Sequence, residues 1–139
     1  MAAWIAIDPA TPENGGLYVV PGTHKLDVLC PDTADGSESF TTHLVKDPLG
    51  RKAVPVKLDS GDVLFFNGSL IHGSPPNRSK TMWRRSFICH YVPKGATQVS
   101  KWYFPLLDFQ GNVVPIPEST DGGPCGKEFQ SVGSYGKWH

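Results

Sequence analysis

The chain has 139 residues, and its 13 lysines and arginines balance its 13 aspartates and glutamates, so the formal net charge is zero. A neutral chain lacks the basic surface that binds nucleic acid or anionic lipid, so neither is expected as a partner. Fifteen glycines and thirteen prolines predict many turns between short strands, because both residues disfavour helix interiors. The composition therefore favours an all-β domain.

The cysteines and the N-terminal residues bear on the compartment. No apolar run approaches the length of a membrane span, and the three cysteines form no CxxC pair of the kind that binds zinc. The apolar start of the chain is too short for a signal peptide and contains Asp8. Three widely separated cysteines fit a reducing compartment, so we expect a cytoplasmic protein that does not contact membranes.

The first elements expected along the chain are two apolar strands joined by a polar turn. "AWIAI", residues 3–7, has the β-branched and aromatic content of a buried strand. Residues 8–16 contain an Asn-Gly pair and predict a turn, and "LYVV", residues 17–20, predicts the second strand. Residues 25–51 are polar and aperiodic, which indicates a long excursion over the surface.

The middle of the chain resumes the β pattern. Residues 54–58 alternate as on a half-buried strand, and "DVLFFNGSLIHG", residues 62–73, is predicted as one apolar strand that delivers His72. "WRRSFICHYV", residues 83–92, predicts a further strand. About five to seven strands result, whereas a closed jelly roll usually has about eight. The first of them also begins at the start of the sequence without a lead-in, so we expect a jelly roll that is incomplete at its N-terminus.

Beyond Pro93 the strand pattern weakens. The apolar "KWYFPLL" contains a proline, and the residues after Gln110 are rich in glycine, proline and serine. We therefore predict a jelly-roll core over residues 1–93 and a loop-rich extension over residues 94–139 that packs on the core. The end of this extension is expected to wrap the surface or to be disordered.

His72 and Arg84 are the residues whose chemistry stands out. His72 ends one predicted strand and Arg84 begins the next, so an antiparallel pairing of these strands would bring both side chains to one mouth. An inward arginine needs an anion, ideally a carboxylate that matches its planar fork, and a neutral imidazole suits a divalent transition metal. A hydrogen-bonded surface histidine and a solvated arginine are the alternatives for each residue taken alone.

Three stretches, taken in order, resemble the phytanoyl-CoA dioxygenase family of iron(II)/2-oxoglutarate oxygenases. They are "WIAIDPATPENGGLYVVPGTHK", "SGDVLFFNGSLIHGSPPNRS" and "RRSFICHYV". The resemblance covers Ala3 to about Pro93, in order, and the residues from Lys94 onward show none. It implies a double-stranded β-helix, the cupin-like form of the jelly roll, and places this chain in the C-terminal half of the family's core.

The resemblance also implies a cofactor, a co-substrate and the residues that hold them. His72 matches a histidine ligand of Fe(II), and Arg84 matches the arginine that binds the distal carboxylate of 2-oxoglutarate. Ser74 matches a serine close to that carboxylate, and Trp4 matches a tryptophan near the co-substrate. The implied reaction hydroxylates a small organic substrate while 2-oxoglutarate becomes succinate and carbon dioxide.

The sequence departs from the family in its metal motif. The family takes two iron ligands from an H-x-D/E motif upstream of the strand at residues 3–7, and none of the five histidines here has Asp or Glu two residues later. A second chain, or a substitute such as His43, His24 or Asp27, would have to complete the site. We therefore expect weak activity or none from this chain alone.

Two alternatives to an enzyme follow from this departure. The first is a non-catalytic jelly-roll fragment that binds a small carboxylate, or that forms a homo-oligomer through exposed strand edges and apolar surface. The second is a cupin-like structural module without a ligand. This alternative is less favoured, because the motifs of His72 and Arg84 occur in the same order as in the family.

Overall fold

The computed structural model describes residues 1–35, 43–100 and 103–119. It divides the chain into two compact units, Met1–Tyr91 and Val92–His139. Regular structure in the described residues is almost entirely β, with one short 3-10 helix, η1, at Thr23–Lys25. The strands of each sheet are antiparallel, and the predicted all-β, cupin-like fold is confirmed.

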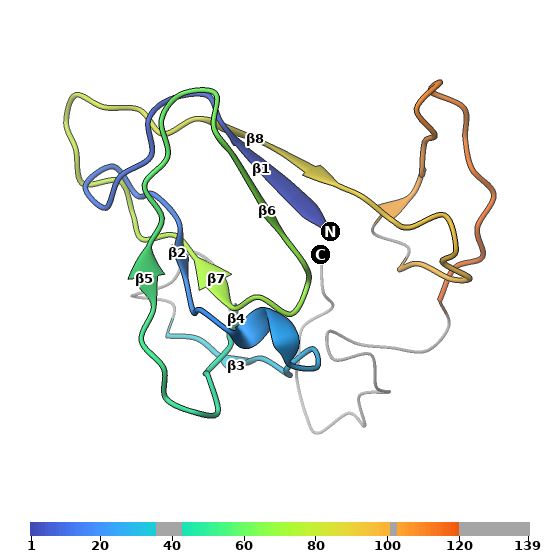
Figure 1. Cartoon of the computed structure of the whole chain (residues 1–139), viewed down its shortest axis with the longest axis horizontal. Helices are drawn as coiled ribbons and strands as arrows, with labels where there is room; N and C mark the ends of the chain where they lie inside the picture. Colours follow the sequence, from blue (N-terminus) through green and yellow to red (C-terminus); the bar gives the residue numbers. More distant parts are fainter. Residues whose placement is uncertain (36–42, 101–102, 120–139) are drawn as a thin grey trace. The chain divides into compact units, whose positions relative to one another are not determined.

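The first unit contains a three-stranded sheet in the order β6-β1-β8 (Figure 1). Strand β1 spans Ala2–Ala6, β6 spans Val63–Phe66 and β8 spans Ser86–His90. Four of the five residues of β1 are buried, which suits a central strand with a neighbour on each side. The strands predicted from "AWIAI", "DVLFF" and "RRSFICHYV" are confirmed, with slightly different ends.

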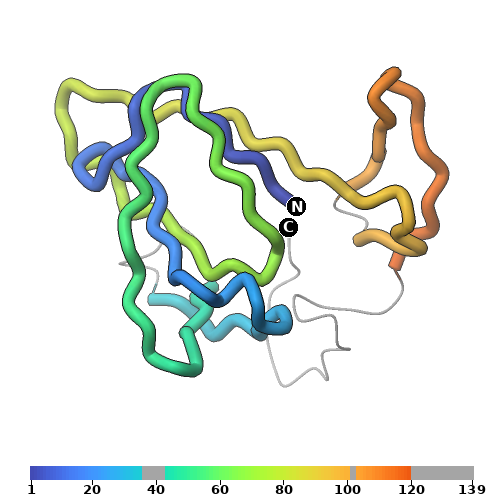
Figure 2. Tube along the Cα trace, viewed as in Figure 1, coloured from blue at the N-terminus to red at the C-terminus, as the bar shows by residue number. Residues whose placement is uncertain are grey.

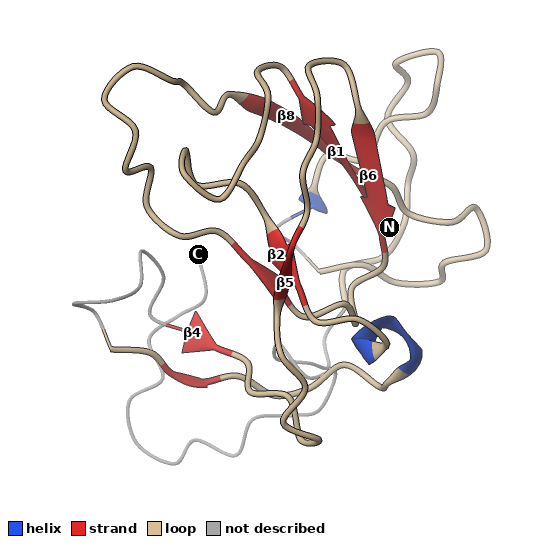
Figure 3. Cartoon of the chain, turned by 60° about the vertical axis from the view of Figure 1, so that its left-hand side comes forward, coloured by secondary structure: helices blue, strands red, loops and turns tan. Residues whose placement is uncertain are grey.

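A second sheet of the same unit has the order β5-β2-β7. Its strands have two residues each: Tyr18–Val19 (β2), Val54–Pro55 (β5) and His72–Gly73 (β7). Figure 3 shows β2 and β5 as a layer separate from the β6-β1-β8 sheet. Proline has no N–H to donate to a ladder, so Pro55 in β5 and Pro21 after β2 favour short strands here.

One prediction for residues 62–73 was wrong, because they do not form a single strand. Strand β6 ends at Phe66, a turn follows in which the Leu70 N–H donates to the Asn67 carbonyl, and β7 joins the other sheet. The turn is fastened from outside the segment, since Asn67 Nδ2 donates to the His24 carbonyl over 2.8 Å. The chain therefore crosses from one sheet to the other just before His72.

The excursion predicted over residues 25–51 contains a small ribbon that the sequence pattern did not indicate. Strands β3 (Asp32–Thr33) and β4 (His43–Leu44) pair antiparallel within it. Nearer its end, Arg51 donates to both carboxylate oxygens of Asp47, over 2.9 and 2.6 Å, and this pair holds the pKa of the Asp47 carboxyl far below its usual range.

The core of the first unit lies between its two sheets. Its most buried members are Trp4, Ala6, Ala10 and Leu17, and the partly buried side chains that pack on them are Val56, Leu58, Leu64 and Phe66. Trp4 and Leu64 come from the β6-β1-β8 sheet, while Leu17 and Val56 adjoin β2 and β5. The inner face of each sheet is therefore the face that carries these residues.

The polar turn over residues 8–16 is organised around Asn14, which is only 1% exposed. Its Oδ1 accepts hydrogen bonds from the N–H and the hydroxyl of Thr11, over 2.8 and 3.2 Å. Its Nδ2 donates to the Pro9 carbonyl over 2.7 Å and to the Trp83 carbonyl over 3.0 Å. The buried amide is thus well satisfied, and its last bond ties the turn to the segment just before β8.

The same turn contacts the segment that follows β7. Gly15 has φ 81°, and a Cβ there would lie 2.7 Å from the Pro75 carbonyl oxygen, so only glycine permits this approach. The Arg78 N–H donates to the Glu13 carbonyl over 3.1 Å. Figure 2 shows the blue turn beside the yellow-green segment that leads from β7 to β8.

The second unit, Val92–His139, is held mainly by turns in its described residues. Its strand pairing there consists of two isolated bridges, Val99 with Glu118 and Leu107 with Val113. The Asp108 carboxylate accepts hydrogen bonds from the backbone N–H and the side-chain amide of Asn112, and then from the N–H of Gln110, which lowers the pKa of this carboxyl. The end of the extension was predicted to wrap the surface or to be disordered. It lies outside the described residues, which end at residue 119.

Two further findings concern the compartment. No helix in the described parts of the chain is long and apolar enough to cross a membrane. Cys89 is a partly buried free thiol. The expected cytoplasmic, reducing compartment stays a prediction.

We predict that Asn14→Ala lowers the free energy of unfolding by roughly 2–3 kcal/mol, because it leaves buried backbone groups without partners. Urea denaturation followed by circular dichroism measures the change. Asn67→Ala is the matched control, since it removes an exposed amide with a single bond, and should cost less than about 1 kcal/mol. Equal losses in the two variants would contradict the prediction.

Candidate functional site

His72 projects from β7 toward the inner face of its sheet. It lies opposite Val19 in the register, and Leu17, two residues before Val19, belongs to the core. The imidazole packs against the Phe66 ring with centroids 4.6 Å apart and planes tilted by 54°. Its Nδ1 lies 2.8 Å from the Leu70 carbonyl oxygen, which can only accept, so a neutral ring carries its proton on Nδ1. Nε2 then keeps a lone pair for a metal or a proton.

Arg84 lies just before β8, at the edge of the face that Trp4 shares with Ile88. Its guanidinium carbon is 6.0 Å from the centroid of the Trp4 ring, which is 2% exposed. This is the geometry of a cation–π contact. The Nε of Arg84 is buried, and it has no hydrogen-bond partner among the described residues. A buried donor on a charged group is costly without an acceptor, so this atom marks a place for an anion.

The neighbouring Arg85 points the other way and pairs with Asp8. Its Nε and Nη2 donate to the two carboxylate oxygens over 2.8 and 2.7 Å, and its backbone N–H donates to Oδ2 over 2.9 Å. These bonds lower the pKa of the Asp8 carboxyl to about 2. Because consecutive residues of a strand face opposite sides, fixing Arg85 on the outside favours the inward direction of Arg84.

The strand that carries His72 does not pair with the strand that follows Arg84. Strand β7 pairs with β2, and β8 pairs with β1, so His72 and Arg84 come from different sheets. They share the inner region through their ring neighbours, because Phe66 contacts His72, Trp4 contacts Arg84, and both rings belong to the same core cluster. The sequence analysis did not single out Phe66, although its spacing of two from Leu64 indicates the inner face.

The remaining predicted residues are less constrained. Ser74 is exposed, and its hydroxyl makes no hydrogen bond within the part of the chain that the structure describes. No three or more His, Cys, Asp or Glu side chains among the described residues form a group that could hold a metal ion. The suggested substitutes His24, Asp27 and His43 therefore do not complete a site around His72 there.

Comparison with known proteins adds family information to this geometry. Residues 1–86 match the family model for phytanoyl-CoA dioxygenase (PhyH). The "Probable phytanoyl-CoA dioxygenase" of Caenorhabditis elegans is 39% identical over 94 residues, which are 65% of this chain and 30% of the relative. The "Dioxygenase lolE1" of Epichloe uncinata is 43% identical over 84 residues, which are 60% of this chain and 29% of the relative.

Two further relatives extend the comparison. The peroxisomal phytanoyl-CoA dioxygenase of Rattus norvegicus is 34% identical over 138 residues, which are 97% of this chain and 40% of the relative. The family model thus ends at residue 86, before Pro93, whereas this alignment extends over nearly the whole chain. The crystal structure of EvdMO1 is 34% identical, covers 63% of this chain and 18% of its own, and superposes with a TM-score of 0.45. The chain spans less than half the length of each of these relatives.

We predict that the Asp8–Arg85 pair stabilises the fold down to unusually low pH. The pKa of Asp8 falls from 3.8 to about 2 on folding, so the stabilisation is complete above about pH 4 and disappears as the pH falls through about 2. The difference in Tm between wild type and Asp8→Asn, measured from neutral pH to about pH 2, should stay constant above about pH 4 and then shrink. Asp59→Asn is the control, and a wild-type advantage over Asp8→Asn that persists undiminished at pH 2 would contradict the prediction.

Proposed function

This chain belongs to the phytanoyl-CoA dioxygenase family, and we propose that it takes part in the iron(II)- and 2-oxoglutarate-dependent hydroxylation of a small organic substrate. In this proposal the chain supplies the arginine that binds the co-substrate and one histidine that binds the metal. The observation that carries the proposal is the buried Nε of Arg84, which has no acceptor among the described residues. The distal carboxylate of 2-oxoglutarate is an acceptor of suitable charge and shape.

The surroundings of Arg84 suit a bidentate carboxylate. Trp4, buried in the core, lies 6.0 Å from the guanidinium carbon and limits the positions that the guanidinium can take. Carboxylate oxygens can then accept from Nε and from a terminal nitrogen on one edge of the fork. We propose that the Ser74 hydroxyl donates a further hydrogen bond to this carboxylate, in keeping with its place two residues after His72.

His72 fits the part of a metal ligand. The Leu70 carbonyl oxygen holds the Nδ1–H, which leaves the Nε2 lone pair available, and the Phe66 ring restricts rotation of the imidazole. When bound, iron(II) with 2-oxoglutarate supplies the activation of dioxygen that hydroxylation requires. A 2-His-1-carboxylate site needs two more protein ligands, which we propose come from a second polypeptide or from residues other than those described.

A second candidate is a non-catalytic module that binds a small carboxylate. It is favoured by the sequence itself, in which no histidine is followed two residues later by Asp or Glu. Carboxylate binding at Arg84 needs no metal, so it could persist without one. Iron content per chain, measured after purification and after incubation with iron(II), separates the two candidates.

We predict that Arg84→Ala weakens binding of 2-oxoglutarate at least about tenfold in isothermal titration calorimetry, since hydrogen bonds to charged groups contribute about 1.5–3 kcal/mol. Arg84→Lys should also weaken binding, because an ammonium is a point charge without a fork. Arg85→Gln is the matched control and should keep the wild-type affinity within about threefold, since Arg85 faces Asp8. Equal affinity of wild type and Arg84→Ala would rule out the role of Arg84.

We predict that the chain alone converts 2-oxoglutarate to succinate very slowly or not at all, because His72 is its one assigned metal ligand. Succinate formation is assayed with added iron(II), ascorbate and 2-oxoglutarate, and His72→Ala should give the same background rate as the wild type. Robust turnover that His72→Ala abolishes would show a complete metal site and refute the prediction.

We also propose that the chain forms a homo-oligomer through the outer face of the β6-β1-β8 sheet. On this face the exposed fraction is 61% for Phe65, 60% for Phe87 and 40% for the neighbouring Val63. Light scattering should detect species larger than a monomer, and the double variant Phe65→Ser/Phe87→Ser should reduce them. Leu49→Ser, which changes a 70% exposed residue in another region, is the control. A wild-type protein that stays monomeric at high concentration would contradict the proposal.

A further inference from the structure

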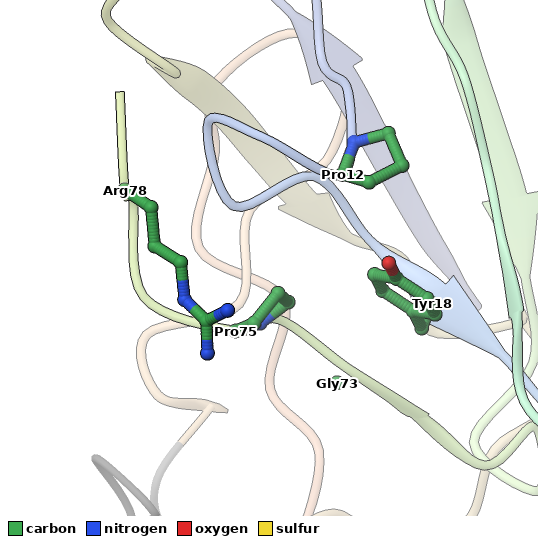
Figure 4. Close-up of a pocket in the computed structure, with 5 residues that line it drawn as sticks. All are labelled: Pro12, Tyr18, Gly73, Pro75 and Arg78. Atoms are coloured by element: carbon green, nitrogen blue, oxygen red, sulfur yellow. The ribbon is translucent and has the colours of Figure 1, made fainter. Parts of the chain in front are cut away.

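A pocket of about 400 Å³, shown in Figure 4, opens on the face of the β5-β2-β7 sheet that carries Tyr18 and Gly73. It is lined by Pro12, Tyr18, Gly73, Pro75 and Arg78. Tyr18 and Gly73 are partners in the register, while the next pair, Val19 and His72, faces the opposite side. The pocket is therefore separate from the inner region that contains His72 and Arg84.

The pocket combines one cation with an aromatic ring and two proline rings. Figure 4 shows the Arg78 side chain running alongside Pro75, with the Tyr18 ring on the other side of Gly73. Neither the Arg78 guanidinium nor the Tyr18 hydroxyl has a hydrogen-bond partner within the described parts of the chain. Gly73 leaves the floor open, because a Cβ there would meet no atom within 4 Å.

The walls of the pocket are held in place before any ligand arrives. The Arg78 N–H donates to the Glu13 carbonyl over 3.1 Å, which joins the loop of Arg78 to the turn of Pro12. Gly15 of that turn sits against the Pro75 carbonyl, and the Asn14 amide fixes the turn from within. A preformed pocket binds its ligand with a smaller loss of conformational freedom.

We propose that this pocket binds a small organic anion with a flat apolar body, of which an aryl carboxylate is the simplest form. The carboxylate would accept hydrogen bonds from the Arg78 guanidinium and from the Tyr18 hydroxyl. The flat body would lie against the Tyr18 ring and the rings of Pro12 and Pro75. A volume of about 400 Å³ is within the range of small-molecule sites. The inference does not depend on the function proposed for Arg84, because the two regions share no residue.

The test is a two-dimensional amide NMR titration of the full chain with benzoate. We expect saturable shifts of the Tyr18, Gly73 and Arg78 amides, and a dissociation constant at least about tenfold higher for benzyl alcohol, which has no charge. Arg78→Gln should raise the benzoate constant by a similar factor. Lys80→Gln is the matched control, because it removes a nearby cation that does not line the pocket, and it should leave the constant unchanged.

The same titration in Arg84→Ala separates the two anion sites. The shifts at Tyr18 and Gly73 should persist there, and their loss would show that they report on Arg84, which would overturn the proposal. It would also be overturned if wild type shows no saturable shift at these amides, or if Arg78→Gln binds benzoate as tightly as wild type. If Arg78→Gln disturbs the whole spectrum, the test is the comparison of the dissociation constants of wild type for benzoate and for benzyl alcohol. Equal constants would show that no charge is required and would overturn the proposal.

Discussion

The turn over residues 8–16 contacts both segments that carry the candidate chemistry, and it is organised around the buried amide of Asn14. Its Nδ2 donates to the Trp83 carbonyl, directly before Arg84, although 69 residues separate the two partners. On the other side of the turn, Gly15 packs against the Pro75 carbonyl, three residues after His72. This short polar turn without regular structure therefore fixes the position of both the segment that follows His72 and the segment that precedes Arg84.

The direction of Arg84 follows from anchors on both of its neighbours. The carbonyl of Trp83 is bound by Asn14, and the backbone N–H and the side chain of Arg85 are bound by Asp8. Between these fixed points the Arg84 side chain enters the side of the sheet that Trp4 occupies. Burying Nε without an acceptor is unfavourable by itself, and the bonds of the two neighbours help to offset that cost in the free protein.

The parts of this fold that follow from the sequence are those with strong local signals. Strands β1, β6 and β8 were predictable because apolar residues run or alternate over four or five positions. The alternation from Ile88 back to Arg84 likewise indicated the inner face for this arginine. The two-residue strand β7 was missed as a separate element, because its pairing with β2 depends on contacts between distant residues.

Those distant contacts also explain what else the sequence analysis lacked. Thr23 Oγ1 accepts the Ile71 N–H over 2.8 Å across 48 residues, and Asp8 pairs with Arg85 across 77 residues. Neither bond has a signature within a window of neighbouring residues. The pocket at Tyr18 and Arg78 is of the same kind, because its lining comes from two distant stretches of the chain, residues 12–18 and 73–78.

Carboxylate binding and metal binding differ in how much of the protein each requires. The environment of Arg84 is built from β1, β8 and the turn that contains Asn14, all of them within the first unit. An iron site would need His72 together with ligands that the described residues do not group around it. Carboxylate binding at Arg84 therefore requires less of the protein than iron binding at His72 does.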